Sequence, residues 1–404
     1  MAEDLLDLFA QWTEPRPSAP IFREWAAIAL IAGALERRVW TDVGAGHCYP
    51  NLFVMLVGPP GSGKNIIEDV KTLWSATILA GSDHPAFHVA KDSYSKASLM
   101  DDLAAAEQER ILPTGAKFTY HSLLAAAEEF PTFFPKFDME FIANLAELWN
   151  CKGAYRERRR ASEVKRLEIT LPCLNLLMGY QPGSMAYTLP QQAWDQGWAR
   201  RTIMIWNHRV EKKPMFARQS RKHALEMAQL QRLSQLASLY GPAYWEPDAT
   251  AHVERWLDAG APPQPTHSRL DGYNQTRGQF CVKLSMVAAA SEASLARNSL
   301  HITLAHVIRA LDWMFRAEAA MPDLFRAMRG ESDINLMNDL HQAMLTYWVR
   351  REKAVPDTLM WKYFADKIPS HKIAQIIATM ANAGMIVRAG EGLWRPEADR
   401  QFVE

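Results

Sequence analysis

The residues best suited to chemistry form a glycine-rich stretch from position 58 to 65. It fits the phosphate-loop pattern G-x-x-x-x-G-K-[ST] at every position but the last. Glycines permit backbone angles that other residues resist, so the loop's amides can converge on phosphate oxygens at a helix N-terminus, where the helix dipole favours anions. Lys64 would contact the outer phosphates as a point charge. The predicted nucleotide-binding residues are Gly58, Pro59, Pro60, Gly61, Ser62, Gly63, Lys64 and Asn65.

The last position of the loop departs from the pattern. Asn65 stands where a Ser or Thr hydroxyl would ligate Mg²⁺. An amide oxygen can also ligate a hard cation, although the side chain is longer and places the oxygen differently. The sequence therefore predicts ATP binding with Asn65 as a candidate metal ligand, and it leaves hydrolysis open. The alternative is a Gly/Pro turn beside an ordinary lysine.

A pair of acids supplies the second candidate motif. The apolar run 122–127 ends in Glu128 and Glu129. In a P-loop ATPase the first acid of such a pair holds Mg²⁺, directly or through water, and the second polarises the attacking water. We assign Glu128 to the metal and Glu129 to the water. The alternative is a helix, which Ala-Ala-Ala-Glu-Glu also suits.

Apolar runs predict the elements that must position these motifs. Residues 51–57 are typical of a buried strand, and 66–74 have helical spacing without a breaker, which is the strand–loop–helix context that a phosphate loop needs. A further run, 174–180, predicts another core strand and is followed by Gln181. The pattern predicts an α/β fold with a parallel sheet flanked by helices.

The densest positive charge in the chain lies between residues 154 and 170, where two facing runs joined by a short turn predict a hairpin. One hypothesis is a loop that lines a channel and contacts a nucleic-acid backbone. The alternative is a solvated face with alternating ion pairs. The candidate DNA contacts here are Arg156, Arg158, Arg159, Arg160 and Lys165.

Paired arginines, Arg200 and Arg201, stand just before another predicted strand. An arginine at this place can reach the nucleotide of a neighbouring subunit and stabilise charge in the transition state. This hypothesis implies a ring or filament, with a hexamer expected. The alternative for either arginine is a surface ion pair.

Composition narrows the possible partners. Lys+Arg 45 balances Asp+Glu 45 over 404 residues, so any nucleic-acid contact must come from local patches. The four cysteines are far apart and form no C-x-x-C pair, which argues against a zinc knuckle or a disulfide framework and fits a reducing cytosol. The longest apolar run, 25–35, is too short to span a bilayer. We therefore expect a cytoplasmic protein without a membrane partner.

Beyond residue 330 the chain changes character. Residues 330–335 resemble a linker, and predicted helices follow at 336–351, 358–366 and 371–383, then a short hairpin at 385–395. Three helices and a two-stranded hairpin are the order of a winged helix. The alternative to DNA contact is a winged helix used only for protein contacts. The candidate phosphate contacts are His371, Lys372, Arg388 and Arg395.

These motifs together resemble a known family. The stretches 50–64, 127–130, 174–182 and 197–201 look like those of phage and prophage P-loop AAA+ ATPases that are catalogued as a domain of unknown function. Such proteins are commonly found near replication genes or fused to primase-like modules. The resemblance covers roughly residues 5 to 320. The second half is similar in order to the minichromosome-maintenance branch of AAA+ helicases.

The resemblance implies further roles and an organisation. Gln181 would contact the outer phosphate or the water, and Arg277, near the start of a predicted helix at 269–296, would be a lid arginine that touches the outer phosphate. The alternative for Arg277 is an ordinary helix-surface arginine. The implied parts are an N-terminal helical segment (1–40), a P-loop AAA+ core (41–210), a helical lid (211–330) and a winged-helix domain (331–404).

We therefore expect an ATP-driven DNA replication motor of a phage or mobile element, either a helicase or a helicase loader. It would use ATP and Mg²⁺, hydrolyse ATP between subunits of a hexameric ring or spiral, and bind single-stranded or forked DNA. A replicative helicase or another replication protein is a possible partner. The alternative from a different class is a nucleotide-gated DNA-binding scaffold or regulator with little or no hydrolysis, which Asn65 motivates. A third hypothesis is an ATPase that acts on protein partners.

Overall fold

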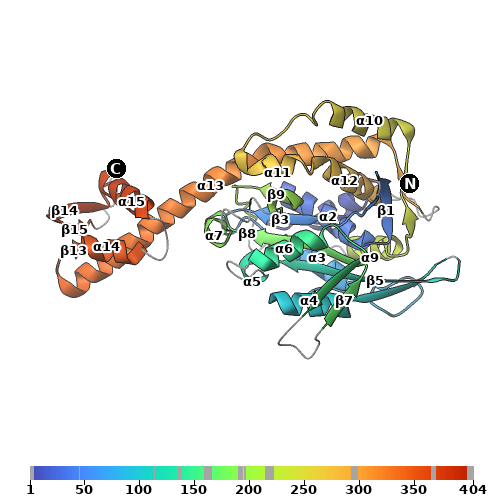
Figure 1. Ribbon diagram of the computed structural model, residues 1–404, viewed down its shortest axis with the longest axis horizontal. Coiled ribbons are helices and arrows are strands. Elements are labelled where there is room, and N and C mark those ends of the chain that lie inside the picture. Colours follow the sequence, from blue (N-terminus) through green and yellow to red (C-terminus); the bar gives the residue numbers. More distant parts are fainter. Residues whose placement is uncertain are drawn as a thin grey trace. The chain divides into compact units, whose positions relative to one another are not determined.

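The predicted apolar runs form the strands of a central sheet (Figure 1). The computed structural model describes residues 4–44, 46–112, 114–133, 139–158, 166–189, 194, 197–213, 223–292, 299–364 and 370–397. Two compact units divide the chain, residues 1–325 and residues 326–404. The first unit thus covers the residues of the predicted N-terminal segment and core, and residues 211–325 of the predicted lid.

Five strands make up the central sheet, in the order β4-β5-β8-β3-β9. Strands β3, β5, β8 and β9 run parallel, and β4 pairs antiparallel with β5. Every residue of β3, β8 and β9 is buried, which is typical of parallel strands covered on both faces. The bounds are β3 Phe53–Val57, β4 Glu107–Ile111, β5 Lys117–Ala127, β8 Pro172–Tyr180 and β9 Thr202–Trp206.

Other elements of the first unit surround this sheet. Those up to residue 206 are α1 (Leu5–Trp12), α2 (Pro20–Leu35), β1 (Val39–Val43), β2 (Gly46–Cys48), α3 (Ile66–Ala76), α4 (Lys96–Ala105), α5 (Phe130–Phe133), α6 (Met139–Leu148), β6 (Ala154–Arg158), β7 (Arg166–Thr170), α7 (Pro182–Thr188) and η1 (Ala199–Arg201). Those that follow are α9 (His223–Leu236), β10 (Gly241–Pro242), β11 (Tyr244–Trp245), α10 (Pro247–Asp258), η2 (Ser268–Leu270), α11 (Asp271–Asn274), α12 (Arg277–Glu292) and β12 (His301–Ile302).

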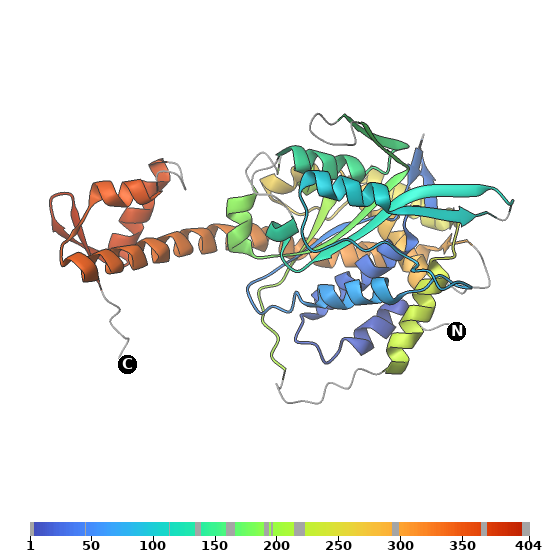
Figure 2. The same cartoon turned by 90° about the horizontal axis from the view of Figure 1, so that it is seen from below.

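Helices cover both faces of the sheet. Figure 2 shows α1, α2 and α3, in blue, on one face and α4 and α6, in cyan and green, on the other. Helix α2 packs on α3 so closely that a Cβ at Gly33 would overlap the Trp74 ring, and the Trp74 indole donates a hydrogen bond to the Leu30 carbonyl at 3.0 Å. The apolar helix ahead of the glycine-rich loop therefore packs against the helix that follows the loop.

Two segments take their structure from pairing with β5. Helix α4 begins after Ser95, the residue that forms the capping box, and residues 107–111 form strand β4, which pairs antiparallel with β5. Residues 87–92 make only an isolated bridge, between Val89 and Leu124. Pairing with a strand distant in the sequence decides both outcomes, and the propensity of one segment alone does not predict them.

Other predictions are confirmed. Residues 154–170 form the hairpin β6–β7, with Ala154 opposite Thr170. The apolar run that ends in Glu128 and Glu129 is a strand, β5, and no helix.

The single helix expected at 269–296 was wrong in its extent, since η2, α11 and α12 share that stretch.

The C-terminal elements follow the predicted order. Helix α13 (Leu304–Arg351) continues through residues 330–335, so the linker expected there was wrong. Helices α14 (Asp357–Phe364) and α15 (Ser370–Asn382) come next, and strands β13 (Val355–Pro356), β14 (Ile386–Gly390) and β15 (Leu393–Pro396) form a sheet in the order β13-β15-β14. Among the described residues, no helix is both long and apolar enough to cross a membrane.

Candidate nucleotide site

The phosphate loop connects β3 to α3 at the carboxyl edge of the sheet. Gly61 and Gly63 have φ of 76° and 83°, angles that favour glycine over all other residues. Lys64 is only 8% exposed and folds back on its own loop, where its Nζ donates to the carbonyls of Gly58 at 2.8 Å and Pro59 at 3.0 Å. The ammonium thus lies inside the loop, and its contact with phosphate stays a prediction.

A segment from the N-terminal region packs against this loop. A Cβ on Gly63 would overlap the Pro17 carbonyl and the Ser18 backbone, so the loop and the segment before α2 approach backbone to backbone. Arg16, from the same segment, forms an ion pair with Asp69, a buried residue in the first turn of α3. No local pattern predicts these contacts, because they join positions some fifty residues apart.

Parallel strands bring the other motif residues to the same edge. The Gly58 amide donates to the Tyr180 carbonyl at 3.1 Å, so the end of β8 lies beside the loop. Gln181 follows β8 and Glu129 lies just beyond the end of β5, and the Gln181 Nε2 donates to Glu129 Oε1 at 3.1 Å. Two residues chosen separately from the sequence therefore form a direct hydrogen bond.

Gly179 is a site residue that the sequence analysis did not select. A Cβ at this position of β8 would overlap the Glu128 carbonyl, so only glycine allows the Glu128 backbone to lie where it does. The signal was present, since a glycine inside a strand pattern often marks a close backbone approach.

Glu128 lies in a field of like charges. Burial raises the pKa of its carboxyl, Glu68 and Glu129 raise it further, and Lys64 opposes them. These interactions place the candidate metal ligand within electrostatic range of the loop lysine. Asn65 is exposed at the N-cap of α3, and its side chain makes no capping hydrogen bond.

The residues fit a magnesium–nucleotide complex. Within the described part of the chain no group of three or more His, Cys, Asp or Glu side chains could hold a metal. Mg²⁺ in nucleotide sites is held by one or two protein ligands together with substrate phosphates and water, so one ligating carboxylate beside the glycine-rich loop suits it. Glu128 and Asn65 are the residues that would hold it.

Arg200 and Arg201 lie on η1, immediately before β9. Arg201 donates to the Gly197 carbonyl at 2.8 Å and its guanidinium is 5.7 Å from the centre of the Trp149 ring. Burial and then the charge of Arg200 lower the pKa of Arg201 to about 10. The surface ion pairs considered as an alternative are not present for either arginine within the described ranges. Contact with a neighbouring subunit stays a prediction.

Arg277 does not occupy the place expected of it. Its side chain has no exposed surface, its Nε and Nη2 donate to the Glu318 carboxylate at 2.7 Å, and further hydrogen bonds go to the carbonyls of Ala261 and Pro263. A guanidinium enclosed in this way contacts no ligand. Arg277 therefore stabilises the packing of α12 on α13, and both sequence interpretations, the phosphate ligand and the surface arginine, were wrong.

The candidate DNA contacts divide into three groups. Arg156 is exposed and forms an ion pair with Glu168 across the hairpin at 2.8 Å, as the solvated-face alternative expects. Arg158 is exposed opposite Arg166, and Arg388 is exposed with its guanidinium 5.5 Å from the Trp394 ring centre. Outside the described residues or side chains lie Arg159, Arg160, Lys165, His371 and Lys372.

Comparison with known proteins adds no family to this geometry. No protein-family model matches the sequence, and no curated protein matches it.

Proposed function

We propose that the protein is a P-loop ATPase that uses Lys64, Glu128, Glu129 and Gln181. The observation that carries the proposal is the hydrogen bond between Gln181 and Glu129 beside a lysine-bearing phosphate loop. Three motifs that are far apart in the sequence meet at one edge of one sheet. The alternative, a Gly/Pro turn without function, does not account for the nearby Glu129 carboxylate that the Gln181 amide orients.

Strand order gives the site its width. Strand β8 separates β3, which leads into the loop, from β5, which leads to the acids. Two strand spacings are about 10 Å, enough for an outer phosphate and an attacking water between the loop and Glu129. A carboxylate at this distance can polarise that water, and the Gln181 amide keeps it oriented.

Lys64 would move only a short way. Its ammonium rests on carbonyls of its own loop, and entering phosphate oxygens offer it stronger, charge-assisted partners. Glu128 and Asn65 would hold Mg²⁺, which neutralises charge that develops on the phosphates. The roles of these residues are thus those of a binding loop, a metal ligand and a water-polarising pair.

We further propose an AAA+ core with a helical lid and a winged helix, acting as a motor in phage or mobile-element DNA replication, a helicase or its loader. Hairpin β6–β7 with its arginines, the arginines of η1 and the order of the C-terminal elements support this. Arg200 or Arg201 would complete the site of the next subunit in a ring or spiral. DNA would be bound through local basic patches, since the chain has no net charge.

ATP turnover tests the proposal, measured with and without single-stranded DNA. Lys64→Ala and Glu129→Gln are each expected to lower turnover by about 100-fold or more, because each removes a group that acts on the transition state. Lys71→Ala is the matched control, since Lys71 is on the same helix and is paired with Asp92. Equal turnover in all four proteins would sink the assignment.

A scaffold that binds ATP without turning it over is the second candidate. Asn65 favours this second candidate, because it stands in the position of the magnesium-binding hydroxyl and its exposed side chain makes no capping hydrogen bond. Asn65→Thr restores the hydroxyl that the loop pattern contains. A large gain in turnover would favour the scaffold, and a loss would make the asparagine a working metal ligand.

A further inference from the structure

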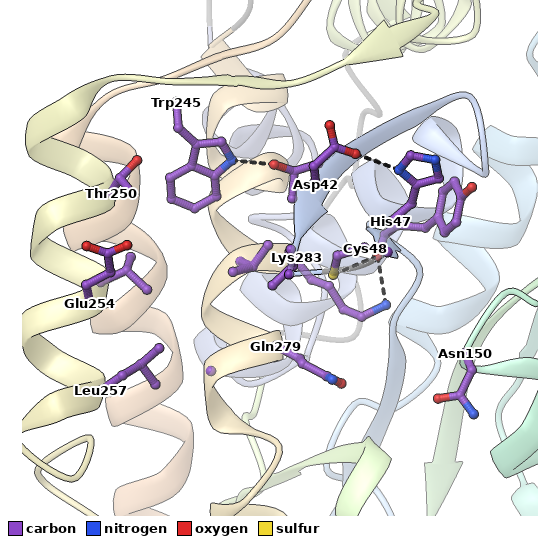
Figure 3. A pocket seen from close by; sticks show the side chains of 18 of the residues that line it. Asp42, His47, Cys48, Asn150, Trp245, Thr250, Glu254, Leu257, Gln279 and Lys283 are labelled. Carbon is purple, nitrogen blue, oxygen red and sulfur yellow. Dashed lines mark hydrogen bonds and ion pairs between the residues drawn. The ribbon is translucent and has the colours of Figure 1, made fainter.

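A cavity of about 680 Å³ lies at the opposite end of β3 from the phosphate loop (Figure 3). Asn51, just before β3, lines it, whereas Gly58 follows that strand. Its walls come from the β1–β2 hairpin, the end of α6, and helices α10 and α12, all within the first unit. Its volume is within the range of sites for small molecules, and its position separates it from the proposed ATP site.

Lys283 is the feature of this cavity that needs an explanation. The side chain reaches from α12 and is 3% exposed. Its Nζ donates to the Tyr49 carbonyl at 2.7 Å and to the carbonyl and side-chain oxygens of Asn51 at 3.0 and 2.6 Å, and it lies 4.2 Å from the centre of the Trp149 ring. All of these partners are uncharged.

Among the described residues no carboxylate pairs with this ammonium. The acidic groups near enough to affect Lys283 are three thiols, Cys48, Cys151 and Cys173, and burial lowers the pKa of the ammonium more than they raise it. A hydrogen bond with Cys173, together with Lys283 and Arg37, lowers the pKa of Cys151 to about 7 despite its burial. Buried charges are normally paired, and an ammonium without a carboxylate partner in the wall of a cavity marks a candidate binding site.

The simpler explanation is that Lys283 only clamps α12 to the segment before β3. A clamp explains the three hydrogen bonds. It does not explain a positive charge beside a cavity, because neutral donors would hold the same carbonyls without the cost of burying an ion. The remaining positive potential is what an anionic ligand would use.

The other lining residues indicate which further groups a ligand of this cavity would carry. Trp245 lies across the cavity from α12, with its indole fixed by a 2.8 Å hydrogen bond to Thr41, and offers a flat apolar surface. Trp149 provides a second ring. The Trp149 Nε1 and the Asn274 Oδ1 are buried and have no partner within the described chain, so the wall keeps an unmet donor and an unmet acceptor.

Two acids also line the cavity. Asp42 is paired with His47 at 2.6 Å, and Glu254 extends from α10 toward the cavity. Glu254 is exposed, so solvent screens part of its charge, whereas Lys283 is buried and its charge is screened far less. The cavity therefore favours a ligand whose single negative charge points to Lys283 and away from Glu254.

We propose that this cavity binds a small aromatic monoanion, with its ring against Trp245 and its charge toward Lys283. The site does not depend on the ATPase proposal, since none of the loop residues lines it. It would be an effector or substrate site at the junction of the core sheet and the helices after residue 246.

Calorimetry on the full chain tests the site with 2-naphthoate and its neutral isostere 2-naphthamide. We expect wild-type protein to bind the anion about tenfold more tightly than the amide, the effect of one charge worth 1.4 kcal/mol. Lys283→Met is expected to remove that preference. Because Glu254 is exposed, Glu254→Gln keeps the fold and is expected to tighten binding of the anion severalfold.

Several results would overturn the proposal. They are no binding of 2-naphthoate to wild-type protein, equal affinity for the amide, a full anion preference in a folded Lys283→Met variant, or no change in Glu254→Gln. If Lys283→Met does not fold, the Glu254 variant alone decides whether the anion senses the charges of this cavity.

The reactivity of Cys48 gives an independent test of where the ligand binds. It lines the cavity and is half-buried, whereas Cys151, Cys173 and Cys281 are buried. Alkylation by N-ethylmaleimide, followed by peptide mass spectrometry, is expected to slow at Cys48 when 2-naphthoate is present and to slow less with 2-naphthamide at the same concentration. An unchanged rate at Cys48 in saturating 2-naphthoate would place the anion elsewhere and contradict the proposal.

Discussion

Two buried lysines stand at the two ends of β3. Lys64 follows the strand and donates to Gly58 and Pro59, and Lys283 donates to Tyr49 and Asn51, which precede it. The first lysine bonds to carbonyls five and six residues away, whereas the second bonds to carbonyls more than 230 residues away. The same kind of hydrogen bond therefore forms a local contact at one end of β3 and joins distant segments at the other.

The acidic groups near the two ammonium groups also differ. Lys64 lies near Glu128, a carboxylate that follows the end of β5. Lys283 has thiols as its acidic neighbours and no carboxylate partner among the described residues. The two ammonium groups thus differ in the kind of acid that the fold brings beside them.

The strongest way to break this comparison is to remove each charge in turn. Lys283→Met is expected to lower the free energy of unfolding by about 3 kcal/mol, because three buried oxygen acceptors lose their donor. Lys64→Met is expected to cost less than about 1 kcal/mol, since water can reach the loop carbonyls once the ammonium is gone. Urea unfolding followed by tryptophan fluorescence measures both. Equal losses would show that the two lysines serve the fold alike.

Gly179→Ala tests whether the position of Glu128, near Lys64, matters to ATP turnover. A Cβ at this position would push the Glu128 backbone away, so we expect ATP turnover to fall by about 30-fold, as misplaced catalytic groups typically cause. Gly153→Ala is the matched control, because nothing lies within 4 Å of its Cβ position. Unchanged turnover in the Gly179 variant would mean that the position of Glu128 does not matter to the reaction.

Gln181→Ala gives the smallest expected change. It removes the amide that orients Glu129, and we expect kcat to fall by about tenfold while KM for ATP stays within twofold, because a positioning group acts on the transition state. Gln181→Asn keeps an amide on a shorter side chain, and its kcat is expected to lie between those of the wild-type protein and Gln181→Ala. A change confined to KM would instead assign Gln181 to ground-state binding of the nucleotide.

Much of the candidate site could be predicted because its signals are local. The glycines around Lys64, the apolar run before Glu128 and the strand before Gln181 are each readable within about ten residues. That these three strands lie side by side, with Gln181 bonded to Glu129, is a property of the parallel sheet. The sequence predicted the parts, and the sheet decided their contacts.

The missed features all depend on partners distant in sequence. Strand β4 forms because β5 lies alongside it, and Arg277 is buried because Glu318 lies 41 residues away in the chain. Helix α13 continues through the residues expected to be a linker, since neither glycine nor polar composition alone ends a helix.

The sequence by itself determined a glycine-rich loop between a strand and a helix, a strand followed by two acids, a basic hairpin and the order of the C-terminal elements. Only the tertiary structure decided that Arg277 is enclosed and that Lys283 is buried beside a cavity, with no carboxylate partner among the described residues. The reason is physical: backbone preference and hydrophobic period act over one or two turns of chain, whereas burial and electrostatic pairing depend on every segment that packs nearby.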